Sequence, residues 1–140
     1  MSKSNVAETA LLNLVFKATT WAQIADDTAT SPSTNITVAL HTADPTETGT
    51  QLSSETAYTG YARVNVARGA GWTVTGNSVS PAADIDFGEC SAAAGGAITH
   101  FSVGTGTSDA MLYYGTVTPN ITMAVGVIPR LKTTSTITED

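Results

Sequence analysis

Hydrophobic residues alternate with polar ones along most of the chain. In "NITVALH" the apolar side chains Ile36, Val38 and Leu40 occupy every second position, and Val64 and Val66 do so in "ARVNVAR". Alternation with a period of two places apolar side chains on one face of a β-strand. Both stretches are therefore predicted to be strands that cover a core with one face.

The stretch "GWTVTGNSVS" has the pattern of a β-hairpin, with Gly76-Asn77 at its turn and with Trp72 and Val74 on its inner face. Further short apolar runs follow in "DIDF", "AITHFSVG", "MLYYGTVT", "ITMAVGVIPRL" and "TTSTIT". Many short strands that are separated by Gly, Pro, Asn and Ser indicate a sandwich or a jelly roll. We therefore expect a mainly β protein, with a compact β-sandwich or jelly-roll-like domain over about 35–138.

The N-terminal region has a helical period instead. Asn5 and Glu8 have the spacing of a capping box, and an apolar stripe follows them. That stripe contains Leu11, Leu14, Val15, Ala18, Ala22 and Ala25, and is widened by Leu12, Phe16 and Trp21. The pattern predicts one α-helix over about 5–25, packed on its own sheet or on a neighbouring subunit. No linker divides the chain, so we expect a single domain over 1–140.

Two stretches without strand alternation, residues 42–60 and 88–96, predict long loops. Loops of that length in a compact domain are often binding elements.

Charged residues make up only 13% of the 140 residues, roughly half the usual share of about 25%. Threonine, alanine, serine and glycine take their place. A surface that is poor in charge and rich in hydroxyl groups is easier to keep in solution when other protein covers it. The composition therefore favours a protein that assembles.

The net charge of −6 excludes two classes of partner. The six basic residues form no cluster, whereas binding to nucleic acid or to anionic lipid depends on clustered Lys and Arg. No apolar run approaches the length of about 18 residues that a membrane span needs. The N-terminus also lacks the pattern of a signal peptide, so we expect synthesis in a cytoplasm.

His41 and Asp44 form the first candidate chemical pair. They are fewer than the three or four ligands that a metal site needs, and His100 joins them only if its strand neighbours that of His41. The turn chemistry of Asp44 before Pro45 is the preferred interpretation. We therefore expect structural roles for both histidines.

The carboxylates of "DIDFGE" form the second candidate site. Asp84, Asp86 and Glu89 do not match a calcium loop, and we interpret them as solvated groups on an edge strand. Cys90 has an acidic neighbour and no adjacent base, which favours a buried thiol over a nucleophile. "GTGTSDA" lacks the lysine and the helix of a phosphate loop and is predicted to connect two strands. We predict no catalytic, cofactor-binding or metal-binding residues.

Several stretches, taken in order, resemble a family of small virion proteins from tailed bacteriophages and prophages. They are "ETALLNLVF", "NITVALHTADPTETGTQ", "ETAYTGYARVNVAR", "WTVTGNSVSPAADIDF", "AITHFSVGT" and "LYYGTVTPNIT". Members of this family are often labelled tail fibre proteins. The chain departs from their pattern at Gly88, where related chains often carry proline.

The resemblance implies a structural role in the virion and no enzymatic activity. Among such roles we favour a capsid decoration or cement protein that binds the assembled shell. A tail-associated accessory, tail fibre or receptor-binding module is the alternative. The expected partners are other virion proteins, either the major capsid protein or tail proteins, together with further copies of the chain in a homo-oligomer.

The interface candidates are Leu12, Phe16, Trp21, Tyr58 and Tyr61, because large apolar and aromatic side chains are common at interface hot spots. A glycan-binding module would instead use Tyr113, Tyr114 and Asp109. A glycoside hydrolase would need Asp84 and Asp86 as its carboxylate pair.

Overall fold

The fold is taken from a computed structural model that describes residues 2–7, 10, 20–25, 33–75, 78–106 and 108–138. Its strands, in chain order, are β1 (Ser2–Lys3), β2 (Asn35–His41), β3 (Val64–Ala67), β4 (Trp72–Thr75), β5 (Ser78–Pro81), β6 (Ile85–Asp86), β7 (Ile98–Gly104), β8 (Met111–Ile121), β9 (Arg130–Leu131) and β10 (Ile137–Thr138). The prediction of a mainly β protein is confirmed.

A five-stranded antiparallel sheet forms the first layer, in the order β1-β8-β7-β2-β3. β2 and β7 are its central pair, with Val38 opposite Val103 and Leu40 opposite Phe101. β8 bulges near its C-terminal end, where residues 117–120 face only Thr99 of β7. Bulges of this kind bend the strand that carries them.

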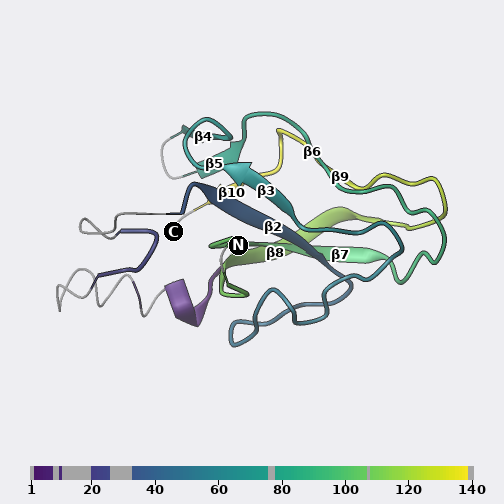
Figure 1. Cartoon of the computed structure of the whole chain (residues 1–140), viewed down its shortest axis with the longest axis horizontal. Helices are drawn as coiled ribbons and strands as arrows, with labels where there is room; N and C mark the ends of the chain where they lie inside the picture. Colours follow the sequence, from purple (N-terminus) through teal and green to yellow (C-terminus); the bar gives the residue numbers. More distant parts are fainter. Residues whose placement is uncertain are drawn as a thin grey trace.

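The second layer contains two small sheets, β10-β5-β4 and β6-β9. They lie above the large sheet in the view of Figure 1 and leave its lower face to the loop that follows β2. The arrangement is sandwich-like, as expected from the pattern of short strands.

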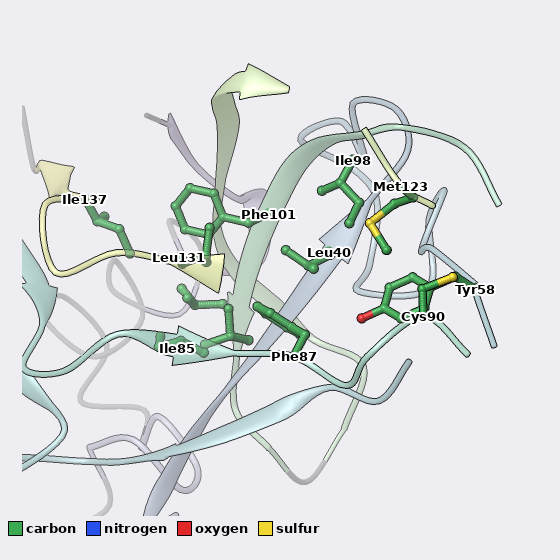
Figure 2. Close-up of a cluster of buried hydrophobic side chains, with 12 residues drawn as sticks. Leu40, Tyr58, Ile85, Phe87, Cys90, Ile98, Phe101, Met123, Leu131 and Ile137 are labelled. Carbon is green, nitrogen blue, oxygen red and sulfur yellow. The ribbon is translucent and has the colours of Figure 1, made fainter. Parts of the chain in front are cut away.

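The core lies between the two layers. Figure 2 shows Leu40, Ile98 and Phe101 of the large sheet meeting side chains of the second layer. The buried cluster contains Val38, Leu40, Tyr58, Ile85, Phe87, Cys90, Ile98, Phe101, Val103, Met123, Leu131 and Ile137. Ile36, Val64 and Val66 pack against its edge, which confirms the prediction that the alternating residues of β2 and β3 face a core.

The β4–β5 hairpin is confirmed, with Thr75 paired to Ser78 across its turn. Trp72 and Val74 are both predicted on its inner face, and this prediction is wrong for Val74. Trp72 packs against the core, but Val74 is 72% exposed. β4 is the edge strand of its sheet, so only β5 lies beside it.

The predicted helix over 5–25 is wrong at its C-terminal end. Residues 5–7 and 10 are helical, but Trp21 and Ala25 close a tight turn, with Gln23 at a φ of 67°. Two threonines immediately before this turn are poor helix formers because of their branched β-carbons. The capping residue is Ser4, whose hydroxyl accepts the Ala7 amide at 3.3 Å, in place of the predicted Asn5.

Candidate functional site

Residues 42–57, which we call the strap, lie over the face of the large sheet opposite to the core. The amide of Thr42 donates to the Ser54 carbonyl, and that of Thr56 donates to the Leu40 carbonyl, each at 2.9 Å. Pro45 and Gln51, which belong to the strap, are fully buried. The prediction of a long exposed loop is therefore corrected, because one side of this segment is packed on the sheet.

His41 joins the strap to the sheet. Its Nδ1 lies 2.8 Å from the Ser53 carbonyl of the strap, and its Nε2 lies 2.7 Å from the Ser102 hydroxyl of β7. The same hydroxyl accepts from Gln51 Nε2 at 3.3 Å, and that nitrogen also donates to the Thr37 carbonyl at 3.1 Å. His41, Gln51 and Ser102 thus form a small hydrogen-bonded network between the strap and the sheet.

Burial lowers the pKa of His41, which disfavours the charged imidazolium. The Ser53 carbonyl and Glu55 act in the opposite direction, while His100 and Arg63 reinforce the effect of burial.

The strands of the two histidines are neighbours, and His41 pairs directly with His100. Both ring nitrogens of His41 are engaged in hydrogen bonds. Within the described part of the chain, no three His, Cys, Asp or Glu side chains gather as a metal site.

A second polar cluster lies where the strap meets the segment before β3. Arg63 forms a bidentate ion pair with Glu55, with both N–O distances 2.7 Å, and also contacts Asp109 at 2.7 Å. The Tyr61 hydroxyl accepts the Leu40 amide at 3.1 Å and donates to Glu55 at 2.9 Å. Both carboxylates raise the pKa of Arg63, mainly through the hydrogen bonds that the guanidinium donates to Glu55.

Asp84 and Asp86 of "DIDFGE" also contact an arginine. Arg130 of β9 binds Asp86 across the β6–β9 pair, and its Nη1 lies 3.5 Å from Asp84. Its hydrogen bonds lower the pKa of Asp86. Asp84 also accepts the Thr133 amide at 3.0 Å. Asp84 and Asp86 thus share one arginine as their partner.

A groove of about 690 Å³ opens where the second layer leaves β8 uncovered. Its floor is apolar, with Phe101, Val117 and Leu131 among the lining residues. Its rim contains Thr116, Thr118, Asn120, Arg130, Lys132, Thr134, Ser135 and Thr136. The sequence predicts neither the bulge in β8 nor this groove. The bulge depends on the pairing of β7 with β8, and the groove depends on how far the second layer extends over β8.

Three loops meet at the end of the molecule beyond β6 and β9, at the right of Figure 1. We call residues 57–60, 88–97 and 122–128 the tip. Backbone hydrogen bonds connect them, among them those from Cys90 to Val127 and from Ser91 to Thr59, each at 2.9 Å. Val125 and Ile128 are 66% and 50% exposed there. A β-carbon on Gly88 would lie 1.9 Å from the Gly60 carbonyl oxygen, so this packing needs glycine at position 88.

A comparison with protein-family models gives one match that spans almost the whole chain. The family is described as "Podophage GP4 fiber I protein gp80", and the match covers residues 2–138. The chain belongs to this family. It is therefore a phage virion structural protein, and the match to a family of the tail-fibre type confirms the resemblance found in the sequence. A search of curated proteins gave no match.

The five residues that the sequence predicts at interfaces of this fibre-family protein differ in burial, and two of them lie outside the described residues. Leu12 and Phe16 lie outside the described residues, and Trp21 is half-buried in its turn. Tyr58 is only 2% exposed, and Tyr61 packs its ring against the core. Burial raises the pKa of Tyr58 to about 12, and its hydroxyl donates to the Gly88 carbonyl at 2.7 Å. Tyr58 is thus buried and Tyr61 is half-buried, and the interface role of both stays a prediction.

The residues proposed for a glycan site do not form one cluster either. Tyr113 pairs with Val103 and Tyr114 with Ser102, so the two tyrosines lie on opposite faces of β8. Asp109 binds Arg63. Cys90 is buried, as predicted, and no helix in the described segments is long and apolar enough to span a membrane.

Proposed function

We propose that this chain is a non-enzymatic structural subunit of a phage tail fibre. The observation that carries the proposal is the family match over residues 2–138, whose description names a fibre protein. That description favours the tail alternative over the capsid decoration role that we placed first on sequence grounds. Decoration of the shell remains the competing outcome of the test below.

The internal pairing of charge supports a structural role. Glu55 and Asp109 are bound by Arg63, while Asp84 and Asp86 are bound by Arg130. A general acid or base needs access to substrate and a pKa near the working pH. Carboxylates whose oxygens are bound by an arginine are less available to a substrate, which argues against a glycoside hydrolase.

The tip is the best candidate for a contact with another virion protein. Val125 and Ile128 are large exposed apolar side chains on loops that are tied together by backbone hydrogen bonds. Glu89 is the only charged residue within the three loops of the tip. An ordered, nearly uncharged surface loses little solvation when another protein covers it. We also propose a homo-oligomer, to which Leu12, Phe16 and Trp21 of the apolar N-terminal segment contribute.

Gold-labelled antibody against the chain, viewed on intact virions by electron microscopy, tests the location. We expect label on the fibres at the tail. Label distributed over the head would overturn the fibre role in favour of shell decoration, and a lack of label on disrupted particles would overturn a virion role.

A matched pair of variants tests the tip. Val125→Asp together with Ile128→Asp should prevent incorporation into particles, because it places charge in the contact. Val74→Asp provides the control, since Val74 is at least as exposed as the two tip residues but lies on the hairpin. Equal incorporation of both variants, measured by quantitative mass spectrometry of purified virions, would contradict a contact at the tip.

A further inference from the structure

The strap covers a face of the sheet that is polar and almost uncharged, and one buried histidine connects the two. We propose that the strap is an acid-released cover, in which protonation of His41 detaches residues 42–57 from the large sheet. The inference does not depend on the fibre assignment, because it concerns a contact within one chain.

The positions of its neighbours determine the protonation state of the His41 ring. A carbonyl oxygen only accepts, so Nδ1 carries the hydrogen that faces the Ser53 carbonyl at 2.8 Å. In the neutral ring Nε2 is then an acceptor, and the Ser102 hydroxyl at 2.7 Å donates to it. The neutral form therefore satisfies both nitrogens, one on the strap and one on the sheet.

Protonation of Nε2 disturbs the hydrogen bonds of Ser102 and Gln51. Nε2 then becomes a donor directed at the Ser102 oxygen, which already accepts from Gln51 Nε2 at 3.3 Å. The hydroxyl hydrogen then has to turn away from the ring and loses the acceptor that it had there, while the oxygen accepts from both the ring and Gln51. Gln51 is fully buried and Gly104 lies against its side chain, so it has little room to move aside.

The charged groups around His41 do not offset the positive charge of a protonated ring. Glu55 of the strap favours it, but that carboxylate is already bound by Arg63 and by the Tyr61 hydroxyl. Arg63 and the cross-strand partner His100 both oppose a positive charge on His41. Asp109 contacts Arg63 as well, so the arginine is shared between two carboxylates.

Separation of the strap from the sheet removes this conflict, because water can then solvate the charged ring. Other contacts also hold the strap: the backbone amides of Gln51 and Thr56 donate to the carbonyls of Asp109 and Leu40, each at 2.9 Å, and Glu55 is paired with Arg63. The β2–β7 ladder does not depend on them. Release would therefore uncover the face that carries Ala39, Ser102 and Gly104 while the sandwich stays folded.

Amide hydrogen exchange, expressed as protection factors, tests the proposal on the whole chain. Protection of the Gln51 and Thr56 amides should fall by about tenfold per pH unit below about pH 6.5, until the His41 ring itself is protonated. The Cys90 amide, which is bonded to Val127 at the tip, should keep its protection over the same range. Parallel loss at all three amides would indicate global unfolding and would overturn the proposal.

Two variants assign the effect to one ring. His41→Asn keeps a donor for the Ser53 carbonyl and cannot be protonated, so the pH dependence of strap protection should disappear. His100→Asn removes the neighbouring histidine on the same face and should leave the pH dependence in place. The proposal fails if His41→Asn retains the pH dependence or if His100→Asn abolishes it.

A titration of the wild-type His41 ring by NMR does not depend on the folding of any variant. The midpoint of the ring titration should coincide with the pH at which strap protection reaches its lower limit. Protonation of His41 without loss of strap protection would overturn the proposal, and so would loss of protection while the ring stays neutral.

Discussion

The two faces of the five-stranded sheet are covered in different ways. On one face, side chains such as Leu40 and Phe101 pack against the apolar residues of the second layer. On the other face, the strap is held by His41, Gln51 and Ser102 through directed hydrogen bonds. Burial of apolar area is insensitive to pH, whereas a network that contains a histidine is not. The first face therefore supplies most of the free energy of folding. The second face makes part of that free energy depend on pH.

The largest effect is expected on the apolar face. Leu40→Ala should lower the free energy of unfolding by about 3 kcal/mol, within the range of about 2–5 kcal/mol for truncation of a buried leucine. Leu40 is fully buried in the centre of the core. Urea denaturation measures the difference. Val74→Ala, at a site that is 72% exposed, is the control and should change stability by less than about 0.5 kcal/mol.

A smaller loss is expected when one charge of the Arg63–Glu55 pair is removed. Arg63→Met should reduce stability by about 2 kcal/mol, below the range of about 3–5 kcal/mol for a fully buried pair, because these side chains are 22% and 15% exposed. The matched control is Arg130→Met, whose arginine side chain is 50% exposed, and this change should reduce stability less than Arg63→Met does. Equal losses in both variants would show that the strap cluster has no special importance.

The fit of the strap against β7 is tested at Gly104. A β-carbon there would lie 2.5 Å from both the Ala110 carbonyl oxygen and the Gln51 Oε1. Gly104→Ala should therefore lower stability by about 1.5 kcal/mol through overpacking. Gly96→Ala meets its nearest neighbour, Thr42 Cγ2, at 3.4 Å and should have little effect on the denaturation midpoint. A stabilised Gly104→Ala protein would contradict the close contact.

Much of the apolar face could be predicted from the sequence, and little of the polar face. The alternation of Ile36, Val38 and Leu40 marks a core face wherever the strand lies in the sheet. The pairing of His41 with His100 depends on strand order, which brings together residues far apart in the chain. The burial of Gln51 likewise depends on the path of the strap, and no local pattern reveals it.

Tertiary packing also determines the surroundings of single side chains. Tyr58 is predicted at an interface because tyrosine is common there, and in the folded chain its ring lies in the core. Aromatic residues serve both purposes, and the choice is made by tertiary packing. The predicted helix extends to Ala25 because the apolar period continues to that residue, whereas residues 21–25 form a turn.

The smallest expected effect is the dependence of stability on pH, and it separates the two faces most cleanly. His41 has a lowered pKa in the folded chain, so the unfolded chain binds a proton first as the pH falls. Its contribution is complete above about pH 6.5 and is lost as the pH falls through the folded pKa, by at most about 1.4 kcal/mol per pH unit.

Thermal or urea denaturation at a series of pH values tests this sign. His41→Gln should flatten the slope below about pH 6.5, whereas Leu40→Ala should lower stability equally at every pH. A slope that is unchanged in His41→Gln would place the titrating group elsewhere.

A cryo-electron microscopy map of the intact virion tests the fibre role most directly. We expect density for the five-stranded sheet and its second layer within the tail fibres, with the tip of the sandwich in contact with another virion protein. The same fold seated on the capsid shell, or absent from every fibre, would contradict the account.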